Sequence, residues 1–205
     1  MQKRKVGILT FSDGRKFAHD LQYTMNKGFQ DKLVKVLEAT GEIECVACEI
    51  VWTPELARSE GKKLAAAGVE ATILNFAIWA FPHLPVIATE FAPGPFLCLS
   101  NVNPKAPGLV AMLAAAGSLN QIGVLHARVS GDVAEPKVLR QVMAFLRAAS
   151  AVNRMRGKTY GLFGGRSMGM YTAVPALDQW RREFGVDIEH IDQWEIVRRS
   201  ETIDQ

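Results

Sequence analysis

Several polar and aromatic segments follow apolar runs that are typical of buried β-strands: residues 12–15, 76–79, 101–103 and 128–132. In an open parallel sheet, ligands bind outside the carboxyl ends of the strands. Arginine offers a fixed fork of donors, asparagine both donates and accepts, and a tryptophan face packs against the C–H side of a sugar. The residue types in these segments therefore suit a polyhydroxylated ligand.

Each segment also has a purely structural interpretation. Asp13-Gly14 is a common turn pair, and Asn101-Val-Asn103-Pro is a sequence that fixes loops. Trp79 lies in a segment with almost no charge, where a tryptophan often belongs to the core. At this stage a ligand site and these structural roles both fit the sequence.

A glycine-rich segment, residues 164–169, follows a predicted strand. Backbone N–H groups in such a loop can hold a phosphate. The segment lacks the lysine of a P-loop and the glycine spacing of a dinucleotide fingerprint. A tight turn that positions Arg166, Ser167 and Met168 is the favoured interpretation, with phosphate binding as the alternative.

No complete catalytic or metal motif is found in the chain. Cys45 and Cys48 lie on a predicted strand, where residues three apart point to opposite faces, so we expect structural thiols rather than a zinc or redox pair. The serines show no Gly-x-Ser-x-Gly elbow. The four histidines are scattered and show no metal-ligand spacing: His19, His83, His126 and His190.

Composition excludes several classes of protein. The 205 residues are 48% hydrophobic and 22% charged, which excludes a disordered chain. A net charge of +3 is too small to indicate nucleic-acid binding. Between residues 71 and 127 only Glu90 and Lys105 are charged, but prolines and polar residues interrupt this stretch, so we expect burial rather than a membrane span. No signal peptide is evident, and we expect a cytoplasmic protein.

Alternating strand and helix patterns predict how these segments are positioned. They indicate an α/β fold, a doubly wound and mostly parallel sheet in a first domain of residues 1–156, followed by the start of a second α/β domain in residues 157–205. Strands are predicted at residues 5–11, 43–52, 69–76, 85–89, 96–100, 122–127, 159–163 and 186–191. One helix is predicted to end near residues 39–41, and others are predicted at residues 55–67, 108–118, 135–153 and 178–183. A last predicted helix runs through Glu195.

Five motifs in one order resemble the N-terminal half of the L-fucose and L-arabinose isomerase superfamily. They are Ser-Asp-Gly-Arg at residues 12–15, the Ala-rich residues 106–116, Asn-Arg-Met-Arg-Gly-Lys at residues 153–158, Gly-Gly-Arg-Ser-Met-Gly at residues 164–169, and residues 186–199. The resemblance spans essentially the whole chain.

The resemblance implies an activity. The family interconverts aldoses and ketoses by moving a proton between C1 and C2, with a divalent metal, typically Mn²⁺, as Lewis acid. It implies two N-terminal α/β domains and an oligomer in which the first domain covers a neighbour's active site. Arg15 and Trp79 match the family's substrate contacts, and Asp13, Asn101 and Asn103 belong to loops expected beside the substrate.

The family's metal ligands lie farther along than this chain reaches, so no catalytic or metal-binding residue is assigned here. We therefore expect the N-terminal portion of an isomerase, a truncated product or half of a split enzyme, that is inactive alone and binds no Mn²⁺. Expected partners are a small sugar and either further copies in a homo-oligomer or a complementary C-terminal half. The alternative is a non-catalytic sugar-binding or assembly module of the same fold.

Overall fold

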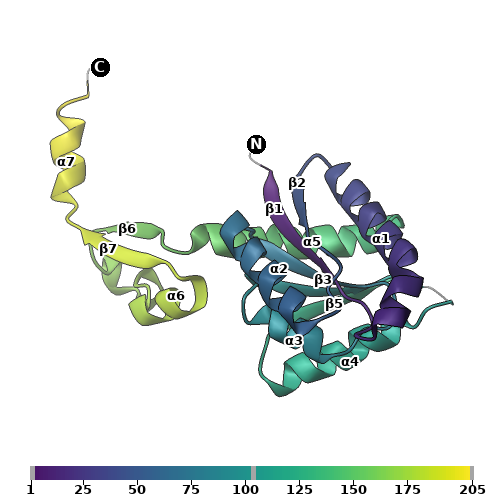
Figure 1. Cartoon of the computed structure of the whole chain (residues 1–205). Helices are drawn as coiled ribbons and strands as arrows, with labels where there is room; N and C mark the ends of the chain where they lie inside the picture. The colour runs from purple at the N-terminus through teal and green to yellow at the C-terminus, as the bar shows by residue number, and fades with distance from the viewer. Residues whose placement is uncertain (1–2, 103–104, 204–205) are drawn as a thin grey trace. The chain divides into compact units, whose positions relative to one another are not determined.

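The computed structural model describes residues 3–102 and 105–203, which form two compact units (Figure 1). The first unit is Met1–Ser150 and the second is Ala151–Gln205. Helix α5 (Pro136–Met155) belongs in part to each. The domain boundary expected at residue 156 stays a prediction.

The first unit contains a five-stranded parallel sheet with strand order β2-β1-β3-β4-β5. This order is doubly wound, because the chain steps outward in both directions from β1 and β3. The predicted fold class is confirmed. The strands are β1 (Arg4–Thr10), β2 (Ile43–Ala47), β3 (Ala71–Phe76), β4 (Phe96–Ser100) and β5 (His126–Ser130).

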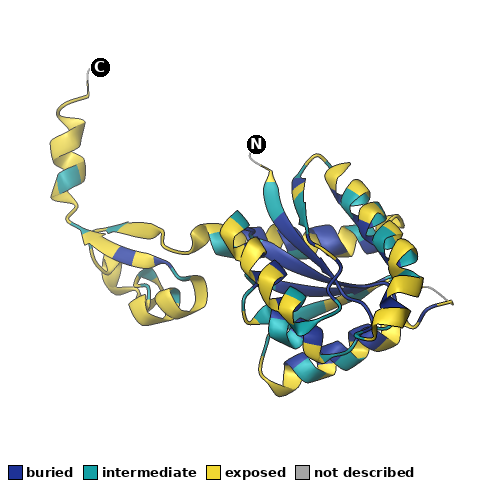
Figure 2. Ribbon diagram, viewed as in Figure 1, coloured by how far each residue is buried: buried dark blue, intermediate teal, exposed yellow. Residues whose placement is uncertain are grey.

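Helices cover both faces of this sheet, and the strands between them are largely buried (Figure 2). Leu33 and Leu37 of α1 (Lys16–Glu38) pack with Val142 and Leu146 of α5 on one face. The other face packs against α2 (Pro54–Ala67), α3 (His83–Thr89) and α4 (Gly108–Gln121). All six residues of β3 are buried because this strand lies at the centre of the sheet.

Helix α2 forms where the local signals predict it. The hydroxyl of Thr53 accepts a hydrogen bond from the Leu56 N–H at 3.2 Å, and Pro54 occupies the first turn. Gly68 ends the helix in the left-handed conformation, with φ of 66°. Both ends of this helix are therefore encoded by residues within the segment itself.

The strand predicted at residues 85–89 is wrong, because these residues belong to helix α3. Pro85 lies in the first turn of that helix, where a missing N–H has no cost. Leu84 and Ala88, four residues apart, are fully buried on one helix face. Packing against the sheet therefore decides the conformation of this short apolar run.

Two other predicted strands have shifted boundaries. The strand predicted through residue 52 ends at Ala47, and only a single bridge between Phe11 and Val51 continues the pairing. The strand predicted at residues 122–127 begins at His126 instead. Gly123, with φ of 76°, forms a turn after α4, and this turn delays the strand.

Substituting Gly108 tests how closely α4 approaches the sheet. A Cβ at Gly108 would lie 2.5 Å from the Phe76 carbonyl oxygen, so we expect Gly108→Ala to lower the free energy of unfolding by about 2 kcal/mol. Gly117 on the same helix has open space around it, and Gly117→Ala should raise that free energy by about 0.5 kcal/mol or more. Urea unfolding of both variants checks the pair. Equal effects would contradict the close approach.

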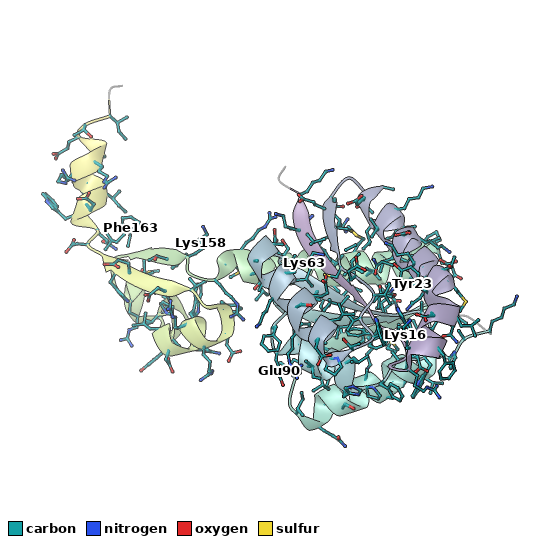
Figure 3. The ribbon with its side chains drawn as sticks, viewed as in Figure 1. Lys16, Tyr23, Lys63, Glu90, Lys158 and Phe163 are labelled. Carbon is teal, nitrogen blue, oxygen red and sulfur yellow. The ribbon has the colours of Figure 1, made fainter. Side chains whose placement is uncertain are left out.

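The second unit contains a two-stranded parallel sheet of β6 (Thr159–Phe163) and β7 (Asp187–Ile191). Two 3₁₀ turns, Ser167–Gly169 and Tyr171–Ala173, and helix α6 (Leu177–Phe184) connect the strands, and α7 (Trp194–Ser200) follows. Lys158 directly precedes β6 and Phe163 is its last residue, and both are labelled in Figure 3. The glycine-rich segment forms a tight turn, with Gly164, Met168 and Gly169 at positive φ.

Among the described residues, no helix combines the length and the apolar character that a membrane crossing needs.

Candidate functional site

Asp13 and Arg15 form an ion pair in the loop that follows β1. Asp13 accepts from Arg15 Nε at 2.9 Å and from Arg15 Nη2 at 2.6 Å, and the Arg15 backbone N–H donates to the same carboxylate at 2.9 Å. The Asp13 side chain is 5% exposed and that of Arg15 is 57% exposed. The hydrogen bonds from Arg15 lower the pKa of Asp13, although burial opposes this. The buried Asp13 carboxylate therefore fixes the position of the exposed Arg15 guanidinium.

Two aromatic rings lie near the Arg15 guanidinium. Its carbon lies 5.5 Å from the Phe17 ring centroid and 6.0 Å from that of Phe81, within the range of cation–π attraction. The Trp79 and Phe81 rings pack edge to face, with their centroids 6.3 Å apart. The structure thus joins Arg15 and Trp79, both predicted as substrate contacts, through Phe81. We call Asp13, Arg15, Phe17, Trp79 and Phe81 the arginine–aromatic cluster.

Gly14 allows the two loops of this cluster to meet. A Cβ at Gly14 would lie 2.7 Å from Cδ2 of Phe81. The loop after β1 and the loop after β3 are neighbours because β1 pairs with β3 in parallel, with Thr10 opposite Asn75. Gly14 therefore leaves room for Phe81 beside the turn, and the substrate role of this loop stays a prediction.

A buried histidine supports the start of α1, the helix that carries Lys16 and Tyr23 (Figure 3). His19 is 7% exposed, stacks on Trp52 at 4.9 Å, and its Nδ1 lies 3.1 Å from Oγ of the buried Ser12. His19 was predicted as a structural residue and Ser12 as part of the loop after the first strand, whereas Trp52 was not predicted as part of the site. The available signal for a role beside the site was the position of His19, about one helical turn after Arg15.

Buried amides fix the carboxyl end of β1 and the chain after β2. Asn75 Nδ2 donates to Thr10 Oγ1 at 2.9 Å, Asn26 Nδ2 to the Phe11 carbonyl at 3.0 Å, and Gln30 Nε2 to the Cys48 carbonyl at 3.0 Å. These bonds satisfy polar groups where the regular strand pairing ends. None of the three amides was predicted as part of the site.

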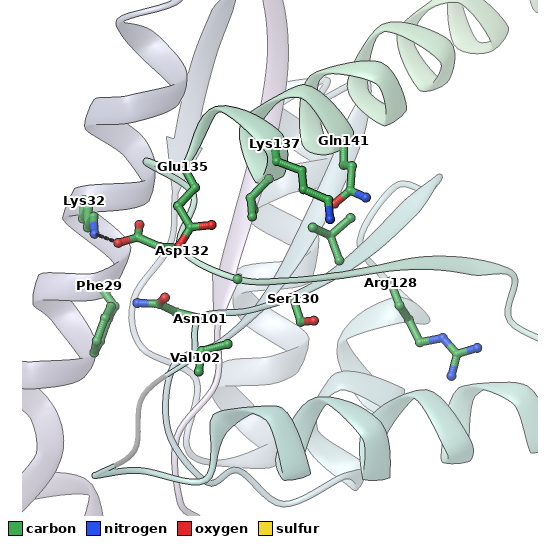
Figure 4. Close-up of a pocket in the computed structure, with 13 residues that line it drawn as sticks. Phe29, Lys32, Asn101, Val102, Arg128, Ser130, Asp132, Glu135, Lys137 and Gln141 are labelled. Atoms are coloured by element: carbon green, nitrogen blue, oxygen red, sulfur yellow. Dashed lines mark hydrogen bonds and ion pairs between the residues drawn. The ribbon is translucent and has the colours of Figure 1, made fainter.

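Asn101 lies in a different part of the same sheet edge, after β4. It lines a cavity of about 840 Å³ together with Phe29, Lys32 and the end of β5 (Figure 4). Among the described residues, no hydrogen bond or ion pair joins Asn101 to the arginine–aromatic cluster. Asn103, the other predicted asparagine, lies outside the described residues.

The metal expected for the family has no set of ligands in the part of the chain that the structure describes. There, no group of three or more His, Cys, Asp or Glu side chains could hold a metal ion. Burial raises the pKa of Cys45, Cys48 and Cys98 to about 12, so these thiols stay protonated at neutral pH. The described residues therefore do not fit a Mn²⁺ site.

The stability of the cluster's support should depend on pH through His19. Burial is the main effect and lowers the pKa of His19 below 6.5, Asp20 raises it and Lys16 lowers it further. The unfolded chain therefore binds more protons, so the free energy of unfolding should fall as the pH drops from 6.5 through the lowered pKa. Urea unfolding between pH 7.5 and 5 should show a smaller decrease for His19→Gln than for wild type. His190→Gln, on an exposed residue of β7, is the control and should behave like wild type.

Comparisons with known proteins identify the family of the chain. Residues 3–157 match the sequence model of the family described as L-fucose isomerase, first N-terminal domain. The L-fucose isomerase of Phocaeicola vulgatus is 30% identical over 96% of this chain and 36% of its own length. Those of Salmonella arizonae and Bacteroides thetaiotaomicron are each 27% identical, over 95% and 96% of this chain.

The chain spans about 36% of the length of these relatives, 35% in the Salmonella arizonae protein. The matched residues 3–157 contain the described part of the first unit, with its doubly wound sheet and the arginine–aromatic cluster. The chain belongs to the L-fucose isomerase family, and its residues 3–157 are the first N-terminal domain of that family.

Proposed function

We propose that this chain is the N-terminal portion of a metal-dependent aldose–ketose isomerase of the cytoplasm and that its first domain covers the sugar in the active site. The observation that carries the proposal is the arginine–aromatic cluster. It presents an exposed, fixed guanidinium beside aromatic rings at the carboxyl edge of a doubly wound sheet, where ligands bind.

The Arg15 side chain suits a sugar hydroxyl. Asp13 takes two of its five N–H groups, and the remaining three have no hydrogen-bond partner among the described residues. A guanidinium already fixed by its carboxylate loses little further freedom when it binds. In this proposal Trp79 packs against the C–H face of the sugar, and Asp13 acts on the sugar only by positioning Arg15.

We further propose that a divalent metal such as Mn²⁺ is held by the part of the enzyme that corresponds to the remaining length of the relatives. When bound, the metal supplies a Lewis acid for the sugar oxygens. Residues of this chain would then bind and orient the sugar, either at a neighbouring subunit of a homo-oligomer or at a complementary C-terminal half.

An assay of the 205-residue chain tests this division of roles. With Mn²⁺ and L-fucose, D-arabinose or L-arabinose, the isolated chain should show no turnover above a protein-free control. The physical reason is that its described residues offer no set of metal ligands. Isomerisation by the isolated chain, abolished by a chelator, would refute the proposal.

A non-catalytic sugar-binding module is the second candidate. It is favoured by the confinement of the whole arginine–aromatic cluster to residues 13–81 of one compact unit. Calorimetry with L-fucose and L-fucitol, comparing wild type with Arg15→Ala, distinguishes the candidates. Arg15-dependent binding by the isolated chain, without any turnover when a C-terminal portion is added, would favour the module.

A further inference from the structure

A cavity of about 840 Å³ lies at the carboxyl ends of β4 and β5, beside α1 and the start of α5 (Figure 4). Its size falls within the range of about 300–1,000 Å³ that small-molecule sites occupy. The arginine–aromatic cluster does not line it. The proposed sugar contacts at Arg15 and Trp79 therefore lie outside this cavity, and among the described residues only Asn101 of the predicted substrate loops lines it.

An internal ion pair forms part of the cavity wall. Lys32 Nζ donates to Asp132 Oδ2 at 2.6 Å, and the Ala134 backbone N–H donates to Asp132 Oδ1 at 2.9 Å. These bonds occupy both carboxylate oxygens, and they lower the pKa of Asp132. Asp132 and Lys32 thus satisfy each other and add no net charge to the cavity.

The other charged groups of the wall have no such partners. Among the described residues, Arg128 and Lys137 form no ion pair, and Glu135 forms none either. Two free cations against one free carboxylate leave an excess of one positive charge. This balance favours a ligand with an anionic group.

The neutral wall residues suit hydroxyl groups. Asn101, Ser130 and Gln141 offer both donors and acceptors. Figure 4 shows Arg128 on one side of Ser130, and Asn101 with Glu135 on the other. A carboxylate such as Glu135 accepts hydrogen bonds from hydroxyls but repels an anion. The cavity therefore has the cationic Arg128 at one end and side chains that suit a polyol at the other, with Lys137 between them beside Gln141 (Figure 4).

We propose that this cavity binds a small polyhydroxylated anion, either a sugar phosphate or a sugar acid. Arg128 and Lys137 bind the anionic group, and Asn101, Ser130 and Glu135 bind the hydroxyls. The site lies within the first unit and is independent of the sugar contacts at Arg15 and Trp79.

Calorimetry on the 205-residue chain at constant ionic strength tests the proposal. D-Ribose 5-phosphate should bind at least tenfold more tightly than D-ribose or inorganic phosphate alone. The double variant Arg128→Gln/Lys137→Gln should weaken its binding about tenfold. The matched control, Arg58→Gln/Lys62→Gln, removes the same charges from exposed positions on α2 and should bind as wild type does.

The outcomes distinguish a sugar phosphate from a sugar acid as the ligand. Equal affinity for D-gluconate supports a site for sugar acids as well as sugar phosphates, and weak gluconate binding supports a site for phosphorylated sugars. Failure of both D-ribose 5-phosphate and D-gluconate to bind, or equal affinity for D-ribose 5-phosphate and inorganic phosphate, overturns the proposal. An equal loss of affinity in the α2 control also overturns it. All four substituted residues are exposed, and thermal unfolding of each variant verifies that it is folded.

Discussion

Arg15→Ala is expected to lower kcat/KM for L-fucose about 100-fold in an enzyme that uses this domain. The enzyme for this test is a chimaera in which residues 3–157 replace the first N-terminal domain of the Phocaeicola vulgatus L-fucose isomerase. The substitution removes the guanidinium that Asp13 fixes and that Phe17 and Phe81 flank. Steady-state kinetics with Mn²⁺ measures the effect.

The matched control for Arg15 is Arg58→Ala. Arg58 is also exposed and also lies near a carboxylate, Glu55 at 3.8 Å, but on helix α2. Its substitution should leave kcat/KM within about twofold of the unsubstituted chimaera, as expected for a surface change. Asp13→Asn should raise KM more than it lowers kcat, because it keeps Arg15 but weakens its positioning. Arg15→Ala and Arg58→Ala variants of equal activity would refute a sugar contact at Arg15.

Phe76→Ala should lower the free energy of unfolding of the chain by about 4 kcal/mol. Phe76 is fully buried at the end of β3 and stacks on Phe11 with ring centroids 5.3 Å apart. A Cβ at Gly108 of α4 would lie 2.5 Å from the Phe76 carbonyl oxygen, so this helix already lies close to the backbone of Phe76 and has little room to move into the space left by the ring. Such a loss is a large share of the roughly 5–15 kcal/mol typical of a domain.

Urea unfolding followed by circular dichroism measures the Phe76 effect. Val110→Ala is the control, because Val110 is 55% exposed on α4 and its substitution should change the free energy by less than about 0.5 kcal/mol. A change below about 1 kcal/mol for Phe76→Ala would contradict the assigned core. Loss of this core contact should also disturb the arginine–aromatic cluster, because Trp79 and Phe81 lie in the loop that follows Phe76.

Elements with local signals could be predicted from the sequence. The ends of α2 are encoded by Thr53, Pro54 and Gly68, and all three act within one or two turns of the helix. Residues 85–89 lack such signals. Their apolar residues satisfy the pattern of a short strand, and only packing on the sheet makes them part of α3.

The arginine–aromatic cluster could be predicted only in part. Asp13 and Arg15 are two residues apart, so their pairing follows from the local turn. The link from Trp79 through Phe81 to Arg15 depends on the pairing of β1 with β3 and on the small volume of Gly14, and neither is visible in the spacing of the residues. Only the resemblance to the isomerase family had already grouped Arg15 and Trp79, as expected substrate contacts.

Long-range polar contacts were beyond prediction. Lys32 and Asp132 are one hundred residues apart, and the buried amides of Asn26 and Gln30 look like ordinary surface residues of a helix. Their roles arise because α1 lies beside the chain segments that follow β1, β2 and β5. A pattern within one segment carries no information about such a neighbour.

Turnover of L-fucose by the unsubstituted chimaera tests the central claim most directly. If residues 3–157 serve as the first N-terminal domain of an isomerase, the chimaera with Mn²⁺ should convert L-fucose to the ketose at a rate well above that of the Phocaeicola vulgatus enzyme lacking its first domain. A chimaera that is folded and matches the parent enzyme in size, yet turns over no faster than the enzyme without this domain, would contradict the claim.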